Sequence, residues 1–274
     1  ATGGAGDDTL VAADVPTTFT VTSLDAGTAT QLGQFASIEN LVGNQRNDLF
    51  LLIGGTLTGT VDGGDGEDTF TGDDVINQFV LTGSNAGTAV GVAGFAQVEN
   101  LSGNAQDDVL TVTGGILTGT FHGAAGNDLL QADNLVNFFG IYGANTGFAT
   151  SVAQFVEVES LQGNAQADTF LFFGGPFAGQ LAGDGGNDTV AGLASGLTFH
   201  LTGPDSGDVD GVTTFSGIEN LAGGAADDRF EVLGGTLTGG ISDAYGGQDT
   251  LVASDLANAW QVTGLDAGDL VGVT

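Results

Sequence analysis

The chain has 274 residues and carries 34 Asp and Glu residues against two Arg, which gives a formal net charge of −32. This charge disfavours nucleic acid and anionic membranes as partners and favours divalent cations or basic surfaces. Hydrophobic residues make up 41% of the sequence, which exceeds the content of a disordered acidic segment, so we expect a folded chain with a sizeable core. No apolar run reaches about 18 residues, and we therefore expect no membrane insertion.

A long internal repeat sets the predicted architecture. The segment Ile38-Glu39-Asn40-Leu41 returns three times in the same spacing. The later copies begin at Val98, Val158 and Ile218. A glycine-rich segment returns in step with it, at Gly54, Gly114, Gly174 and Gly234. Self-similarity of this kind is typical of solenoids.

A finer period appears when each repeat is folded back at intervals of about 20 residues. Leu41, Val61 and Leu81 then align, and so do Asp48 and Asp68. Each coil is predicted to carry two short strands joined by corners rich in glycine, Asp and Asn, with no need for a helix. We predict an all-β fold, a right-handed parallel β-helix or β-solenoid with coils of about 20 residues in 60-residue repeats.

Phenylalanines recur at two positions of the repeat, and we expect both to lie in a continuous core. One position is occupied by Phe19, Phe79, Phe139, Phe199 and Trp260, and the other by Phe35, Phe95, Phe155 and Phe215.

Residues 1–274 are predicted to form a single array of four 60-residue repeats and a partial one. The sequence begins partway through a coil and shows no cap at either end. Uncapped solenoids expose strand edges that can pair. We therefore expect a segment of a longer solenoid, or a subunit that stacks end to end on other copies of itself.

The corner segments Gly3-Gly4-Ala5-Gly6-Asp7-Asp8-Thr9-Leu10 and Gly63-Gly64-Asp65-Gly66-Glu67-Asp68-Thr69-Phe70 resemble RTX nonapeptides, the calcium-binding repeats of secreted bacterial proteins. Later copies keep Asp128, Asp188 and Asp249. Over nearly its whole length the chain is similar to the β-helical arrays of giant secreted bacterial surface proteins and adhesins. The resemblance implies a secreted protein, extracellular or at the cell surface. RTX motifs usually run in tandem, whereas here the full motif comes once per repeat.

Aspartates on adjacent coils are predicted to form pairs at one corner. Two carboxylates about 5 Å apart repel by roughly 3 kcal/mol at an effective dielectric constant of 20, so repeated pairs need relief. Ca²⁺ is one source of relief, because it prefers hard oxygen ligands. The predicted ligands are Asp48, Asp68, Asp108, Asp128, Asp168, Asp188, Asp228 and Asp249. The alternative is that each aspartate accepts hydrogen bonds from corner amides in an Asx-type turn.

The recurrent Glu39, Glu99, Glu159 and Glu219 are expected to stabilise a bend before the following Asn or Ser.

Few residues of the chain suit catalysis. There are two His and two Tyr, with no Cys or Lys. His122 and Tyr142 are 20 residues apart, so they are expected to lie side by side on neighbouring coils, with Gln162 on the next coil. We expect this group to be a chance feature of the surface, and the protein not to be an enzyme.

The sequence thus favours an extracellular structural solenoid, an adhesin spacer, surface-layer or filament element stabilised by Ca²⁺. The alternative is a carbohydrate-binding module or a β-helix of the glycan lyase or epimerase type, with cell-surface glycans as partners. A third hypothesis is that the chain is a polymer subunit that does not bind Ca²⁺.

Overall fold

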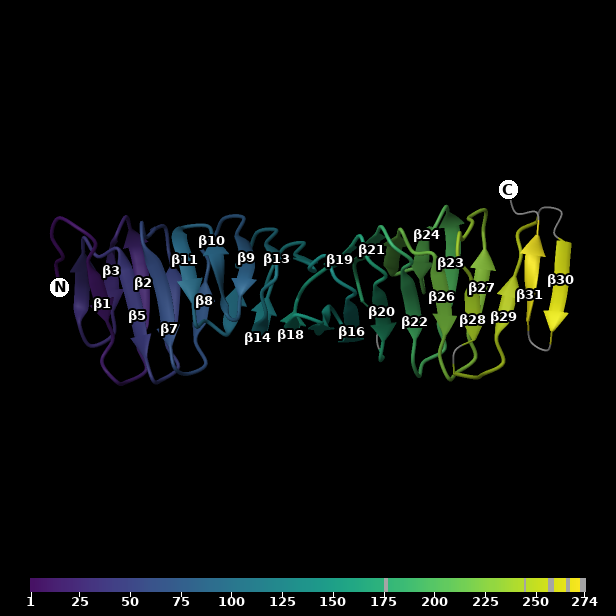
Figure 1. Cartoon of the computed structure of the whole chain (residues 1–274), viewed down its shortest axis with the longest axis horizontal. Coiled ribbons are helices and arrows are strands. Elements are labelled where there is room, and N and C mark those ends of the chain that lie inside the picture. The colour runs from purple at the N-terminus through teal and green to yellow at the C-terminus, as the bar shows by residue number, and fades with distance from the viewer. Residues whose placement is uncertain (175–176, 244, 256–258, 265–266, 272–274) are drawn as a thin grey trace. The chain divides into compact units, whose positions relative to one another are not determined.

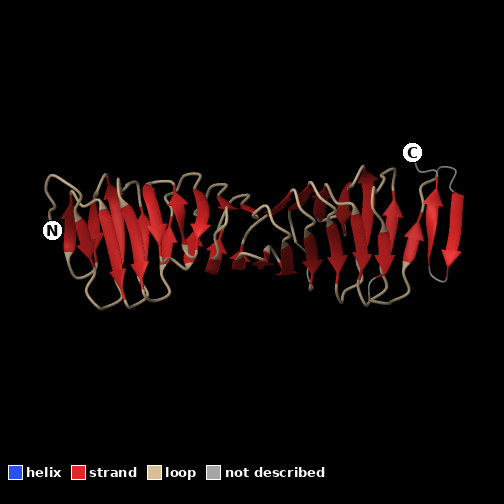
Figure 2. Ribbon diagram, in the orientation of Figure 1, coloured by secondary structure: helices blue, strands red, loops and turns tan. Residues whose placement is uncertain are grey.

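The computed structural model describes residues 1–174, 177–243 and 245–255, and the backbone of 259–264 and 267–271. Every regular element in these residues is a β-strand, which confirms the predicted all-β class (Figures 1 and 2). The described residues contain no candidate for a membrane-spanning helix. The chain divides into two compact units. Unit 1 comprises Ala1–Asp133 and Phe148–Ser160, and unit 2 comprises Asn134–Gly147 and Leu161–Thr274.

In unit 1 the chain passes back and forth between two sheets. Sheet A1 has the order β4-β3-β2-β6-β8-β12-β14-β18, and sheet B1 has the order β1-β5-β7-β11-β10-β9-β13-β15. The strands are β1 (Thr9–Val11), β2 (Thr18–Ser23), β3 (Ala26–Ala29), β4 (Gly33–Ala36), β5 (Asn40–Asn44), β6 (Leu49–Leu52), β7 (Thr60–Gly64), β8 (Thr69–Thr71), β9 (Gln78–Gly83), β10 (Ala86–Ala89), β11 (Val92–Ala96), β12 (Asn100–Ser102), β13 (Val109–Val112), β14 (Leu117–His122), β15 (Leu129–Gln131) and β18 (Val152–Val156).

Unit 2 is built in the same way. Sheet A2 has the order β16-β20-β22-β26-β28, and sheet B2 has the order β19-β21-β25-β24-β23-β27-β29. The strands are β16 (Phe138–Gly143), β20 (Thr169–Phe172), β21 (Gln180–Asp184), β22 (Thr189–Gly192), β23 (Thr198–Gly203), β24 (Ser206–Val209), β25 (Thr213–Ser216), β26 (Asn220–Gly223), β27 (Arg229–Val232), β28 (Ile241–Asp243), β29 (Thr250–Val252), β30 (Ala259–Gly264) and β31 (Ala267–Val271). The chain passes from one unit to the other within β17 (Thr146–Ala149) and β19 (Ser160–Asn164). Strands β30 and β31 pair with each other as an antiparallel hairpin.

The predicted coil offset holds for the first two coils of a repeat. Leu41 pairs with Val61 in parallel strands, and Phe50 pairs with Phe70. The third coil differs, because Val61 pairs next with Phe95 and Leu81 pairs with Gly87. The prediction that Leu81 continues the column of Leu41 and Val61 is therefore wrong.

The third part of each repeat is an antiparallel meander. In unit 1 the strands β2, β3 and β4 form one meander and β9, β10 and β11 form another. In unit 2 the strands β23, β24 and β25 form the equivalent one. Hairpin turns place Asp25, Asn85 and Asp205 at positive φ, where Asp and Asn are tolerated better than most residues. The meander could not be predicted from the alternation of apolar and polar residues. Side chains alternate inward and outward in the strands of a meander just as they do in the strands of a coil.

The meander makes successive repeats change sheets. In unit 1 one repeat consists of five passes, β5, β6, β7, β8 and the meander β9–β11, which alternate between B1 and A1. Because five is odd, the next repeat starts with β12 in A1 rather than in B1. Equivalent residues of consecutive repeats within a unit therefore belong to opposite sheets.

The core lies between the two sheets of each unit and contains the predicted phenylalanines. Phe19, Phe79, Phe139 and Phe199 are each 0% exposed. The rings of Phe19 and Phe50 stack with centroids 5.0 Å apart, as do Phe139 with Phe170 and Phe199 with Phe230 at 4.7 and 4.9 Å. The other predicted column, Phe35, Phe95, Phe155 and Phe215, is also buried. The side chain of Trp260 lies outside the described residues.

Candidate functional site

The predicted aspartates lie in corners that lead into strands. Asp48 directly precedes β6 and Asp68 directly precedes β8, and these residues are only 2% and 0% exposed. The structure brings the predicted neighbours together. In each pair the backbone N–H of the first aspartate donates to Oδ1 of the second, at 2.7 to 2.8 Å. The four pairs are Asp48 with Asp68, Asp108 with Asp128, Asp168 with Asp188, and Asp228 with Asp249.

Each pair is part of a longer relay of hydrogen bonds along one edge of a sheet. In unit 1 the N–H of Thr17 donates to Asp48 Oδ1 at 2.6 Å, and the N–H of Asp48 donates to Asp68 Oδ1 at 2.7 Å. The N–H of Asp68 then donates to Glu99 Oε2 at 2.8 Å. Carboxylates thus join four successive strands, β2, β6, β8 and β12, at the point where each begins.

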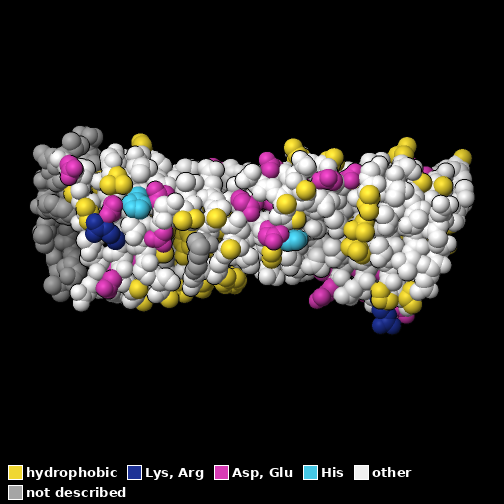
Figure 3. All heavy atoms as spheres, turned by 180° about the vertical axis from the view of Figure 1, so that it is seen from behind, with side chains coloured by type: hydrophobic (Ala, Val, Ile, Leu, Met, Phe, Trp, Pro, Cys, Tyr) yellow, Lys and Arg dark blue, Asp and Glu magenta, His cyan; other side chains and the backbone are white. Residues whose placement is uncertain are grey.

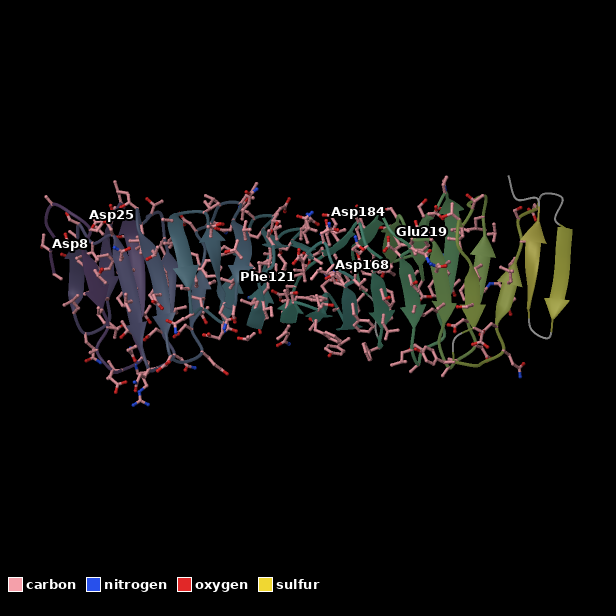
Figure 4. The ribbon with its side chains drawn as sticks, viewed as in Figure 1. Asp8, Asp25, Phe121, Asp168, Asp184 and Glu219 are labelled. Atoms are coloured by element: carbon pink, nitrogen blue, oxygen red, sulfur yellow. The ribbon has the colours of Figure 1, made fainter. Side chains whose placement is uncertain are left out.

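The relay recurs once per repeat in both units. The second relay runs through Asn77, Asp108, Asp128 and Glu159, and the third through Asn137, Asp168, Asp188 and Glu219. Asp168 and Glu219 are labelled in Figure 4. The role of the glutamates is more specific than the predicted support of a bend, because each one accepts the amide of an aspartate 31 residues earlier.

The second carboxylate oxygen separates the aspartates into two classes. Asp48 Oδ2 accepts the N–H of Asn44 at 2.8 Å, and Asp108 Oδ2 accepts the N–H of Asn104 at 2.9 Å. In contrast, Oδ2 of Asp68 and of Asp128 is buried without a hydrogen-bond partner. Asp188 and Asp249 share this property.

Backbone conformation explains the missing donors in three of these corners. Four residues before the aspartate stand Gly64, Ala124 and Asp184, with φ of 92°, 76° and 67°. In the corner of Asp48 the equivalent residue, Asn44, donates its N–H to the carboxylate. At Gly64 the N–H instead meets Asp62 Oδ1 at 3.2 Å. The left-handed conformation therefore goes together with loss of the local donor to Oδ2.

Burial alters the titration of these three carboxyl groups. The pKa of Asp68 is raised from 3.8 to about 6, mainly because burial removes water from the charged form. The amide of Asp48 opposes the rise, while the negative charges of Glu99, Asp48 and Asp62 add to it. The pKa of Asp128 and that of Asp188 are also raised to about 6, again mainly by burial.

In the corners from Asp8 to Asp228, a glycine five residues before the aspartate makes room for the carboxylate. Asp249 is the exception, because Ala244 stands at this spacing. A Cβ at Gly63 would overlap the carbonyl oxygen of Gln97 and the side chain of Asp68. The equivalent glycines are Gly3, Gly43, Gly103, Gly123, Gly163, Gly183 and Gly223. The Gly-x-x-x-x-Asp spacing in the sequence is thus the local signal for a carboxylate folded over the preceding backbone.

The predicted Ca²⁺ ligands already accept hydrogen bonds from the backbone. In each of them Oδ1 accepts a backbone N–H. In the residues that the structure describes, no three His, Asp or Glu side chains are placed so that they could hold a metal ion. The contacts shown are those of the amide-binding alternative, and Ca²⁺ binding stays a prediction. Acidic side chains on the face drawn in Figure 3 are scattered rather than gathered.

The structure does not build the predicted group of His122, Tyr142 and Gln162. His122 in β14 is flanked by Ser102 and Val156, and its Nε2 lies 2.9 Å from Glu157 Oε2. In unit 2, Tyr142 belongs to sheet A2 and Gln162 to sheet B2. The predicted adjacency is wrong because it assumed that one coil offset holds throughout the repeat.

Sequence reasoning missed a polar cluster on sheet B2. His200 Nδ1 lies 2.7 Å from Asp208 Oδ1, and His200 Nε2 lies 3.6 Å from Glu231 Oε2. Glu231 is also paired with Arg229. The meander creates this cluster by pairing His200 with Asp208 in antiparallel strands. The described contacts of this cluster include no nucleophile held by the imidazole.

Comparisons with family models, curated proteins and solved structures find no match to this chain.

Proposed function

We propose that this chain is a structural β-solenoid segment displayed outside the cell, as an adhesin spacer, surface-layer or filament element. The observation that carries the proposal is the carboxylate relay. Buried and half-buried carboxylates accept the amide directly before each of several successive strands in both units. The most unusual polar groups of the chain are therefore used to hold neighbouring passes together. Charge-assisted bonds of this kind are among the stronger hydrogen bonds in proteins.

A structural role predicts that the relay resists force. The full chain would be stretched between its ends in an optical trap, and wild type compared with Asp108→Asn. Both carboxylate oxygens of Asp108 accept a backbone N–H. The Asn side chain has only one oxygen, so one buried N–H is left without an acceptor, at a cost of about 1–3 kcal/mol. We expect unfolding at clearly lower force.

Asp65→Asn is the matched control, because Asp65 is an exposed acid in the corner before Asp68. It should unfold at the wild-type force. Equal unfolding forces for wild type and Asp108→Asn would contradict a mechanical role of the relay.

The alternative of a carbohydrate-active module is tested separately. A panel of neutral and acidic polysaccharides would be screened for binding and cleavage, with wild type and with the double variant His122→Ala and Tyr142→Ala. We expect no difference between them. An activity that is lost in the double variant, while its circular dichroism is unchanged, would overturn the structural proposal.

A further inference from the structure

The outer side of sheet A2 carries a small apolar cluster. Alternation along β20 places Phe170 in the core and Leu171 on the opposite side of the sheet. Leu171 is nevertheless only 9% exposed, because outward-facing neighbours pack over it. We refer to this cluster as the apolar face, and it consists of Phe138, Leu171, Phe173, Ala191, Leu193 and Ala222.

The fold does not require these apolar residues. One repeat earlier, the equivalent positions are occupied by Gln78, Thr111, Thr113, Gln131, Asp133 and Gln162. Thr111 and Gln131 face outward in paired strands of sheet B1, as Leu171 and Ala191 do in A2. Polar residues therefore suit the same backbone, so strand pairing alone does not call for apolar side chains at these positions.

The apolar face also lacks charge. The outward positions of β16, β20, β22 and β26 carry no Asp, Glu, Arg or Lys within the described strands. This stands out on a chain with a net charge of −32. Two copies of such a chain repel each other wherever their carboxylates approach. At the apolar face they can meet without bringing carboxylates together.

We propose that the apolar face is a docking surface for a second copy of this chain. The two faces would pack against each other across a twofold axis, as one sheet packs on another. Tyr142 enlarges the contact, since its ring lies 5.5 Å from that of Phe173 and the residue is 54% exposed. Aromatic residues of this kind contribute strongly to protein interfaces.

This association differs from the predicted end-to-end stacking in two measurable ways. A twofold contact closes at the dimer, whereas end-to-end contacts continue into longer series. Added NaCl should strengthen the dimer, because salt screens the repulsion between the two acidic chains and leaves the apolar contact intact.

The test is sedimentation equilibrium of the full chain over a wide concentration range. The variant Leu171→Thr, Phe173→Thr, Leu193→Asp carries the residues that the preceding repeat has at these positions. We expect a monomer–dimer equilibrium for wild type and a dissociation constant raised at least about tenfold in the variant. Each subunit then presents a polar and a charged side chain in place of the partly buried Phe173 and Leu193. Leu193→Asp alone should also raise the dissociation constant of the dimer. This single variant replaces the triple variant in the test if the triple variant does not fold.

Ile53→Thr is the control. Ile53 occupies the repeat position of Phe173 but belongs to unit 1, and it is 57% exposed. It should leave the dimer unchanged. A wild-type chain that stays monomeric in NaCl would overturn the proposal, even if it captured a polysaccharide or another protein. Dimers that persist in the triple variant, or larger assemblies that it does not affect, would overturn it as well.

Discussion

The backbone N–H of Asp68 donates to Glu99 Oε2 at 2.8 Å, although a complete antiparallel meander separates the two residues in the chain. The same bond joins Asp8 to Glu39, Asp128 to Glu159 and Asp188 to Glu219. The glutamate is therefore the point at which one repeat is attached to the next.

Replacing Glu99 by Ala should destabilise the chain. The change removes the acceptor of the Asp68 amide and of the Asn85 side chain, which meets Glu99 Oε1 at 2.8 Å. Leaving a buried amide without an acceptor costs about 1–3 kcal/mol. Urea unfolding followed by circular dichroism measures the loss. Glu67→Ala, at an exposed position of the adjacent corner, should have little effect, and equal losses in both variants would contradict the assigned role.

Stability should depend on pH through Asp68, Asp128 and Asp188. Their pKa is raised from 3.8 to about 6, so between these values the folded state holds protons that the unfolded state releases. Their contribution is fully present below about pH 4 and is lost as the pH rises through about 6. Replacing all three by Asn keeps an oxygen for the neighbouring amide and removes the titrating group. The variant should gain stability relative to wild type as the pH rises from about 4.5 to about 7.5.

Urea unfolding at several pH values measures this difference. Asp8→Asn is the comparison, because Oδ2 of Asp8 accepts the N–H of Gly4 at 2.7 Å. A difference between wild type and the triple variant that does not change with pH would exclude the elevated pKa values.

Ca²⁺ binding at the aspartate corners has its own signature. A metal that binds only the folded state raises its stability by RT ln(1 + [L]/Kd) per site. Bound Ca²⁺ should therefore raise the melting temperature above that in NaCl of matched ionic strength, and Asp68→Asn with Asp128→Asn should reduce this gain. Equal melting temperatures in millimolar Ca²⁺, in NaCl and in EDTA with added NaCl would show that screening alone suffices.

Engineered cysteines can check the register of the meander, since the chain has no Cys of its own. Asp62 pairs with Ala96 in parallel strands, so Asp62→Cys with Ala96→Cys should form a disulfide on mild oxidation. Uniform coils without a meander would instead place Asp62 beside Thr82. Cross-linking of Asp62→Cys with Thr82→Cys, in preference to the first pair, would contradict the meander.

Local patterns in the sequence determined the strands, the buried phenylalanines and the pairing of the corner aspartates. Alternation of apolar and polar residues identified strands and the buried phenylalanines, because side-chain direction in a strand depends only on position along it. The coil offset brought Asp48 to Asp68, since those two coils do follow each other without interruption. The glycine five residues before each corner aspartate from Asp8 to Asp228 is likewise a local requirement.

Only the tertiary structure decided which strands pair and in which direction. Alternation is the same in a coil and in a meander, so the sequence pattern could not distinguish Val61 beside Phe95 from Val61 beside Leu81. The change of sheet at each repeat follows from that choice, as do the Asp68 to Glu99 bond and the cluster around His200. Strand pairing is a contact between residues distant in the chain, and it is set by the packing of whole strands rather than by the residues within any one of them.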